Sequence, residues 1–299
     1  MQEKKFFGTI TEVLASFHED GSLDEQYVRD FTEFQIESGI NGLFVNGLTP
    51  SETLCLSTEE KIELGRIVCS QTAGRVPVMC NIMTNSYRDG LKMVDAFTSF
   101  GCDAICATPP MIYRMSPDAM YEFFSRIIKA SSLPMYIYNQ PQSGNPMPPE
   151  LIARISKDHD NLVGYKDSTN DATHLQILIT KTKDKPLNIL TGSDSTIYTA
   201  LTLGCQGGIS YLSAIFPELM LKITDAYFSG DIEGAYKAQL KAIEVRDLLK
   251  KYPARSAYRY ASKLTGHPMG YSRLPDALFR LSPEQEKSVE AGLKNLGVI

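Results

Sequence analysis

One lysine ends a run of residues that predicts a buried strand. Burial of its amine is unfavourable unless the amine has a chemical role. Lys166 ends the apolar run Asn161-Leu-Val-Gly-Tyr-Lys166, and turn-forming residues from Asp167 to Asn170 follow it directly. Burial of a lysine is unfavourable, so this position needs an explanation. One interpretation is a desolvated amine that attacks a ketone to form an imine; the other is a strand-end lysine that extends its ammonium to solvent beside Asp167. Taken alone, the stretch favours the second interpretation.

The elements that position Lys166 alternate regularly along the chain. Short apolar runs, each followed by a helical pattern, predict strands over 8–15, 42–46, 76–82, 103–108, 133–138, 161–166, 187–191 and 207–212. The helical patterns carry clear start signals. Ser57-Thr-Glu-Glu60 reads as a capping box, and Ser116-Pro117 places a proline at the first helical position.

This alternation predicts an α/β fold, a closed (β/α)8 TIM barrel with a C-terminal helical extension. We expect residues 1–225 to form the barrel and residues 226–299, which carry only helical patterns, to pack on its outside. An open doubly wound sheet is disfavoured, because eight similar units run without a Gly-x-Gly-x-x-Gly fingerprint.

Composition narrows the class of protein. The net charge of -5, without blocks of like charge, argues against binding to nucleic acid. No apolar run reaches membrane-spanning length, and no secretory segment opens the chain, so we expect no membrane association and a cytoplasmic location. Six cysteines without a Cys-x-x-Cys pair, and four scattered histidines, predict free thiols and no bound metal.

In a barrel of this kind, chemistry lies at the carboxyl ends of the strands. Those positions hold an amine, a phenol, several hydroxyls and glycine backbone: Lys166, Tyr138, Thr49, Ser51, Gly192, Asp194, Ile209 and Ser210. Singly, each has an ordinary structural explanation, such as a half-buried strand tyrosine or a turn threonine. Together they suit a lysine imine with a 2-oxo acid, in which Tyr138 moves protons and hydroxyl and N–H donors hold the carboxylate.

With these residues in hand, the chain resembles the dihydrodipicolinate synthase / N-acetylneuraminate lyase family of pyruvate-dependent class I aldolases. The resemblance covers nearly the whole length. It is carried by Tyr138-Asn139-Gln140-Pro141, Gly164-Tyr-Lys166-Asp-Ser-Thr169, Gly192-Ser-Asp194 and Gly207-Gly-Ile209-Ser210.

The resemblance implies roles for the matching positions. Lys166 would form the imine with pyruvate, and Tyr138 would donate and accept protons. Thr49 would take part in the carboxylate-binding turn, and Ile209 would offer backbone contacts near the keto acid. In the altered loop of this chain, the carboxylate would be held by Thr49 with Ser51 or by backbone donors. Gly192, Asp194 and Tyr211 would lie against the second substrate. The family implies no metal or organic cofactor, and a homotetramer built as a dimer of dimers.

Three loops depart from the family pattern. The Gly-Thr-Thr-Gly-Glu-like loop reads Gly47-Leu-Thr-Pro-Ser-Glu52, and Pro-Pro-Tyr-Tyr reads Pro109-Pro-Met-Ile-Tyr113. A tyrosine of that second motif normally completes a proton relay across a subunit contact, and Tyr113 is the candidate substitute. No arginine follows Pro141, where Gln142-Ser143-Gly144 stands, so an anionic semialdehyde lacks its bidentate partner.

These observations predict a carbon–carbon lyase that reversibly cleaves a 2-keto-3-deoxy sugar acid into pyruvate and an aldehyde. A pocket lined by Ser143, Asp194 and Tyr211 would suit the hydroxyls of such a substrate. Two alternatives keep the imine: a dihydrodipicolinate synthase-like condensation, or dehydration or decarboxylation of a sugar acid. A third, motivated by the altered loops, is a catalytically impaired relative that binds keto acids.

Overall fold

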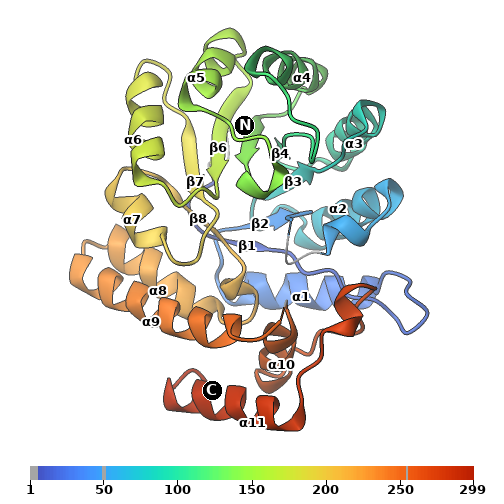
Figure 1. The fold of residues 1–299 in the computed structure, drawn as a ribbon, viewed down its shortest axis with the longest axis vertical. Coiled ribbons are helices and arrows are strands. Elements are labelled where there is room, and N and C mark those ends of the chain that lie inside the picture. The colour runs from blue at the N-terminus through green and yellow to red at the C-terminus, as the bar shows by residue number, and fades with distance from the viewer. Residues whose placement is uncertain (1–5, 49–51, 254) are drawn as a thin grey trace.

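The computed structural model describes residues 6–48, 52–253 and 255–299, and its centre is a closed barrel. Eight parallel strands pair in chain order, and β1 closes the ring against β8 (Figure 1). The strands are β1 (Gly8–Glu12), β2 (Gly42–Val45), β3 (Val78–Ile82), β4 (Ala104–Ala107), β5 (Met135–Asn139), β6 (Leu162–Asp167), β7 (Asn188–Thr191) and β8 (Gly207–Ser210). The predicted (β/α)8 barrel is therefore confirmed.

Helices alternate with the strands and form the outer ring of the barrel (Figure 1). They are α1 (Glu25–Glu37), α2 (Thr58–Thr72), α3 (Tyr87–Phe100), α4 (Pro117–Ala130), α5 (Pro149–Asp158), α6 (Ala172–Lys181), α7 (Ile197–Thr202) and α8 (Pro217–Phe228). The predicted start signals are present: Ser57 forms a capping box with Glu60, and Ser116 caps α4 ahead of Pro117.

One strand is shorter than its apolar pattern predicts. We expected the first strand to continue to Ala15, but β1 ends at Glu12. The register pairs Glu12 with Phe44, and β2 ends one residue later at Val45, so the neighbouring strand offers no further ladder. Glu12 therefore lies at the carboxyl end of β1, among the functional positions of the barrel.

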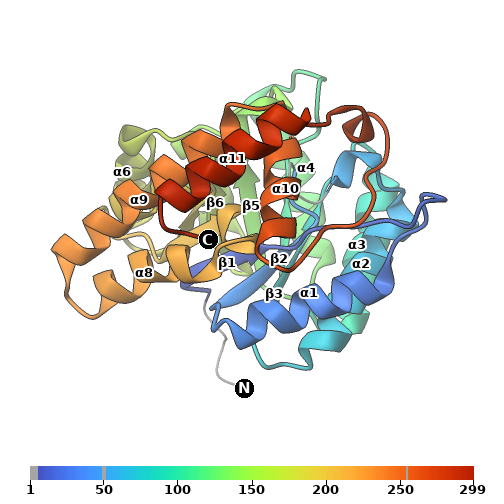
Figure 2. The same ribbon diagram turned by 90° about the horizontal axis from the view of Figure 1, so that it is seen from below.

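The C-terminal helices share their core with the barrel's last helices. They are α9 (Ile232–Lys250), α10 (Ser256–Leu264) and α11 (Pro283–Asn295). Val245, Leu249 and Leu293 are fully buried in one cluster with Leu201 of α7 and Met220 of α8. Figure 2 shows α9, α10 and α11 together on one side of the barrel. The helices α9 and α11 therefore pack against α7 and α8, and the division into 1–225 and 226–299 stays a prediction.

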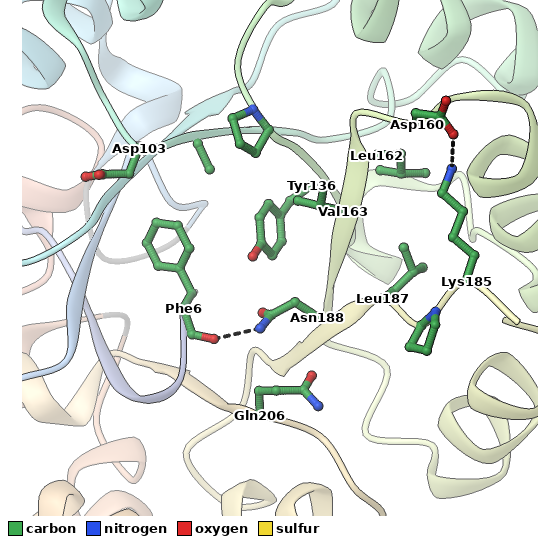
Figure 3. Close-up of a pocket in the computed structure, with 13 residues that line it drawn as sticks. Phe6, Asp103, Tyr136, Asp160, Leu162, Val163, Lys185, Leu187, Asn188 and Gln206 are labelled. Atoms are coloured by element: carbon green, nitrogen blue, oxygen red, sulfur yellow. Dashed lines mark hydrogen bonds and ion pairs between the residues drawn. The ribbon is translucent and has the colours of Figure 1, made fainter. Parts of the chain in front are cut away.

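A cavity of about 390 Å³ opens at the amino ends of the strands, away from the predicted site. Phe6, Tyr136 and Asn188 face this space, and Asn188 Nδ2 donates to the carbonyl of Phe6 over 2.8 Å (Figure 3). Lys185 pairs with Asp160 at 3.0 Å on its rim. This end of a (β/α)8 barrel serves stability, so the cavity is no candidate for the chemistry.

Candidate active site

The lysine predicted to react is buried at the carboxyl end of β6. Lys166 is 1% exposed, and the β5–β6 register places it beside Tyr138. Its Nζ lies 3.9 Å from the ring centroid of Phe44 and 3.9 Å from that of Tyr138. Aromatic faces attract the ammonium form, and the two rings fix the position of the amine. Lys166 therefore does not extend to solvent, and the interpretation of it as a strand-end lysine with a solvated ammonium is excluded.

Tyr138 provides a phenol directly beside this amine. Gln140 Nε2 donates to Tyr138 Oη over 2.9 Å, and Ser168 Oγ donates to it over 3.3 Å. Burial raises the pKa of the phenol, Lys166 lowers it and Glu12 raises it further. A phenol with a raised pKa keeps its proton at neutral pH, so Tyr138 is set to donate that proton to a reacting oxygen.

A third ionisable group, which sequence reasoning missed, completes this cluster. Glu12 Oε2 lies 4.0 Å from Lys166 Nζ, and the Glu12 side chain is buried. Burial raises the pKa of this carboxyl to about 7, while the nearby Lys166 lowers it. Because the first strand was predicted to continue to Ala15, Glu12 lay in the middle of that predicted strand and not at its carboxyl end. The short register with β2 is the signal that identifies it as a strand-end residue.

Glycines bring the backbone close to the reacting groups. A Cβ at Gly192 would lie 2.2 Å from Ser168 Oγ and 3.0 Å from Lys166 Cε, so a larger residue there would displace Ser168 and crowd the Lys166 side chain. Gly192 N donates to the carbonyl of Asp167 over 2.6 Å, which ties the ends of β6 and β7 together. Gly192, predicted to lie against the second substrate, and Ile209, predicted to lie near the keto acid, both line the adjoining cavity.

The cavity beside this cluster has a volume of about 240 Å³. Tyr138, Gly192, Asp194, Ile209 and Tyr211, all predicted site residues, line it. Asp194 uses both carboxylate oxygens within the protein: Ser210 Oγ donates to one over 2.6 Å, and Leu212 N to the other over 3.3 Å. Burial raises the pKa of Asp194, and the bond from Ser210 lowers it. Asp194 thus holds the end of β8 as well as facing the cavity.

Four of the predicted residues lie elsewhere or outside the described ranges. Thr49 and Ser51, expected to hold the substrate carboxylate, lie outside the residues that the structure describes. Tyr113 does not line the cavity and is 71% exposed. Ser143, expected among the pocket residues, is buried without lining the cavity. A relay role for Tyr113 would therefore require a second copy of the chain.

Cations from the C-terminal helices form a wall of the cavity that the strand-end rule could not find. Arg246 and Lys250 of α9, and Arg255 just before α10, all line it. Arg246 pairs with Asp247 at 3.0 Å, and Arg255 pairs with Asp276. Burial lowers the pKa of Lys250, and so does Arg246. An anionic substrate would therefore meet cations from the C-terminal helices, although no arginine follows Pro141.

The described residues hold no group of three or more His, Cys, Asp or Glu side chains arranged to bind a metal ion. All six cysteines are free thiols, as predicted. None of the helices in the described ranges combines the length and apolar character needed to cross a bilayer.

A buried lysine beside a tyrosine at the carboxyl ends of adjacent strands is an arrangement that suits enzymes acting through a lysine imine, the class I aldolases and lyases. Comparison with known proteins agrees. The chain belongs to the dihydrodipicolinate synthetase family, whose sequence model matches residues 5–296. It is accordingly an enzyme of the pyruvate-dependent class I aldolase and lyase type, as the sequence resemblance implied.

Individual relatives cover nearly the full chain. An uncharacterized DapA-like lyase of Thermofilum pendens is 32% identical over 96% of this chain and 95% of its own length. A probable 2-dehydro-3-deoxy-D-pentonate aldolase, YjhH of Escherichia coli, is 28% identical over 99% of both chains. The dihydrodipicolinate synthase of Acinetobacter baumannii, solved with pyruvate, has a TM-score of 0.90 at 25% identity and covers 99% of this chain and 100% of its own.

Proposed function

We propose that the protein reversibly cleaves a 2-keto-3-deoxy sugar acid into pyruvate and an aldehyde through an imine on Lys166. The observation that carries this proposal is the placement of Lys166 Nζ, buried and 3.9 Å from the Tyr138 ring at the mouth of the barrel. The relative named as a probable 2-dehydro-3-deoxy-D-pentonate aldolase, 28% identical, supports this substrate class.

The reaction follows from the chemistry of these two side chains. Lys166 attacks the ketone of the substrate and, with loss of water, forms an iminium that withdraws electrons from the C3–C4 bond. Tyr138 relays the proton of the C4 hydroxyl: its Oη accepts this proton while its own phenol proton passes to solvent, and the C3–C4 bond breaks to leave an enamine and release the aldehyde. Protonation at C3 and hydrolysis then release pyruvate and regenerate the amine.

The substrate would occupy the cavity of about 240 Å³ beside Tyr138. Ile209 is the proposed backbone contact near the keto acid, Gly192 the proposed contact of the second substrate, and Thr49 and Ser51 remain the proposed carboxylate donors. The hydroxyls of the aldehyde part would meet polar side chains that line the cavity: Gln140, Gln142, Ser168, Asn170, Ser193, Asp194 and Tyr211. A polar lining of this kind suits a polyhydroxylated chain better than an apolar aldehyde.

Reduction with borohydride in the presence of pyruvate, followed by intact mass, tests the imine. We expect an adduct on wild-type protein and none on Lys166→Ala. An adduct that survives Lys166→Ala would overturn the mechanism. Release of free pyruvate from 2-keto-3-deoxy-pentonate then tests the reaction, because a dehydratase or decarboxylase would keep the carbon chain beyond C3 attached. Stabilisation by pyruvate without turnover over a panel of aldehydes would instead support a binding protein.

The cationic wall favours a second candidate, condensation of pyruvate with an aldehyde that carries an anionic group. A 4-hydroxy-tetrahydrodipicolinate synthase of Pelobacter propionicus is 27% identical over 98% of this chain and 100% of its own length. Under this candidate, Lys250→Met raises KM for the anionic aldehyde about tenfold and leaves the pyruvate adduct unchanged. Lys237→Met, an exposed change on the same helix, is the control. An unchanged KM in Lys250→Met would argue against this candidate.

A further inference from the structure

Glu12 occupies an unusual position beside the reacting amine. Its side chain is buried at the carboxyl end of β1, with Oε2 4.0 Å from Lys166 Nζ. The other oxygen, Oε1, is buried and has no hydrogen-bond partner among the residues that the structure describes. Buried polar atoms are nearly always paired, so an exception next to a reactive group indicates a partner that arrives with the ligand.

The backbone of the neighbouring strand end makes room for this carboxyl. A Cβ at Gly47 would lie 1.5 Å from Glu12 Oε1 and 2.0 Å from its Cδ. Any side chain at position 47 would therefore displace the carboxyl. Leu48, the next residue, has no polar group to offer. This part of the site therefore holds the Glu12 carboxyl from β1. Position 47 is a glycine and contributes no side chain there.

Charged and titratable groups surround Glu12 from every neighbouring part of the site. They are Lys166 of β6, Tyr138 of β5, Asp194 after β7, Tyr211 after β8 and Arg255 before α10. Burial dominates over the two cations and raises the pKa of Glu12 to about 7. A group with a pKa near the working pH is efficient both as an acid and as a base.

We propose that Glu12 is a further catalytic residue, the acid–base group that carries protons while Lys166 forms its imine. This inference rests on the proposed function, because it requires the imine. The Glu12 carboxylate takes a proton from the Lys166 ammonium, and the neutral amine attacks the ketone to form the C–N bond. One nitrogen proton moves to the former carbonyl oxygen. The Glu12 carboxyl then protonates that hydroxyl, the C–O bond breaks, water leaves, and the carboxylate is regenerated beside the iminium.

The test measures how fast pyruvate forms the borohydride-trappable adduct between pH 5.5 and 9. Wild-type protein should show a rate that rises with pH through about 7. In Glu12→Gln the rate should fall about a hundredfold and the inflection should disappear, while the final adduct still forms on Lys166. Glu233→Gln, the same change at an exposed position of α9, should leave both features unaltered.

A second variant separates chemistry from folding. Glu12→Ala should be slow and should regain adduct formation when formate is added, since formate can occupy the vacated carboxyl position. Circular dichroism melts establish that each variant is folded before its rate is compared. Wild-type-like rate and inflection in Glu12→Gln, or no effect of formate on Glu12→Ala, would overturn the role of Glu12. Failure of wild-type protein to form any adduct would instead overturn the proposed function.

Discussion

At the scale of single residues, the site places two proton-handling groups, Glu12 and Tyr138, beside one amine. Burial raises the pKa of Tyr138 and outweighs the hydrogen bond that Ser168 donates to its Oη, so Tyr138 remains a protonated phenol near neutral pH. Glu12 has a pKa of about 7 and changes its charge in the same pH range. This difference suits a division in which Glu12 serves imine formation and Tyr138 serves the C–C bond step.

Replacement of Tyr138 by phenylalanine tests this division. The ring that lies against Lys166 remains, but the hydroxyl proposed to act on the C4 oxygen is lost. We expect kcat for cleavage of a 2-keto-3-deoxy acid to fall by about 10²- to 10⁴-fold, while pyruvate still forms its adduct. Tyr87→Phe, outside the site, should retain wild-type kcat. Equal loss of adduct formation and cleavage in Tyr138→Phe would show that the hydroxyl acts before the C–C step.

Glu12 should also make stability depend on pH. Its pKa is raised from 4.5 to about 7 in the folded protein, so the folded state holds the proton more tightly than the unfolded state. Stability should therefore fall as pH rises from about 4.5 to 7, by on the order of 3 kcal/mol. Glu12→Gln removes this penalty.

We expect Glu12→Gln to be more stable than wild-type protein at pH 8 and equally stable near pH 4.5. Urea unfolding at both pH values measures the difference, with Glu233→Gln as the exposed control. A constant difference across this range would mean that Glu12 does not titrate between folded and unfolded states.

At the scale of elements, strand ends decided what the sequence could predict. Lys166 and Tyr138 were accessible to sequence reasoning because both stand at the end of an apolar run with turn residues after it. Glu12 was not, because Val13, Leu14 and Ala15 continue the apolar pattern beyond the true strand. Only the register with β2 ends β1 at Glu12.

The cations of α9 and α10 show a second limit of the same kind. Arg246 and Lys250 lie four residues apart on α9, a spacing typical of any solvated helix face. Their approach to the cavity depends on how α9 packs against α8, which no local pattern encodes. The barrel was predictable from periodicity, whereas this wall required the tertiary arrangement.

The shared core predicts that α9 unfolds together with the barrel. Leu249 is fully buried in the cluster with Leu201 and Met220, whereas Leu240, on the same helix, is 44% exposed. We expect Leu249→Ala to lower the free energy of unfolding by about 2–5 kcal/mol, and Leu240→Ala to change it by less than about 0.5 kcal/mol. Urea unfolding followed by circular dichroism should show one transition in each case. Two transitions would indicate that 226–299 is a separate unit.

At the scale of the whole molecule, large apolar side chains are exposed on the segment after α10. Tyr271 is 57% exposed, Leu274 68% and Leu278 72%, and Cys55 Sγ donates to the carbonyl of Leu274. Tyr113, 71% exposed, would reach a second site only across a subunit contact. Neighbouring apolar side chains of this size are typical of contacts between chains, in line with the homotetramer that the family resemblance implies.

Sedimentation of the purified protein should therefore give the mass of a tetramer. A charge at Leu274 would be desolvated in such a contact, so Leu274→Asp should shift the mass toward dimer or monomer. Ile232→Asp, an exposed change at the start of α9, serves as the control and should leave the mass unchanged.

If Tyr113 completes a relay in the neighbouring subunit, Leu274→Asp should lose kcat in proportion to its dissociation, and Tyr113→Phe should lose kcat while remaining a tetramer. Full kcat in a monomeric wild-type protein would exclude a role for Tyr113 in a neighbouring subunit. Its side chain does not line the cavity of its own chain either, so Tyr113 would then have no part in the reaction.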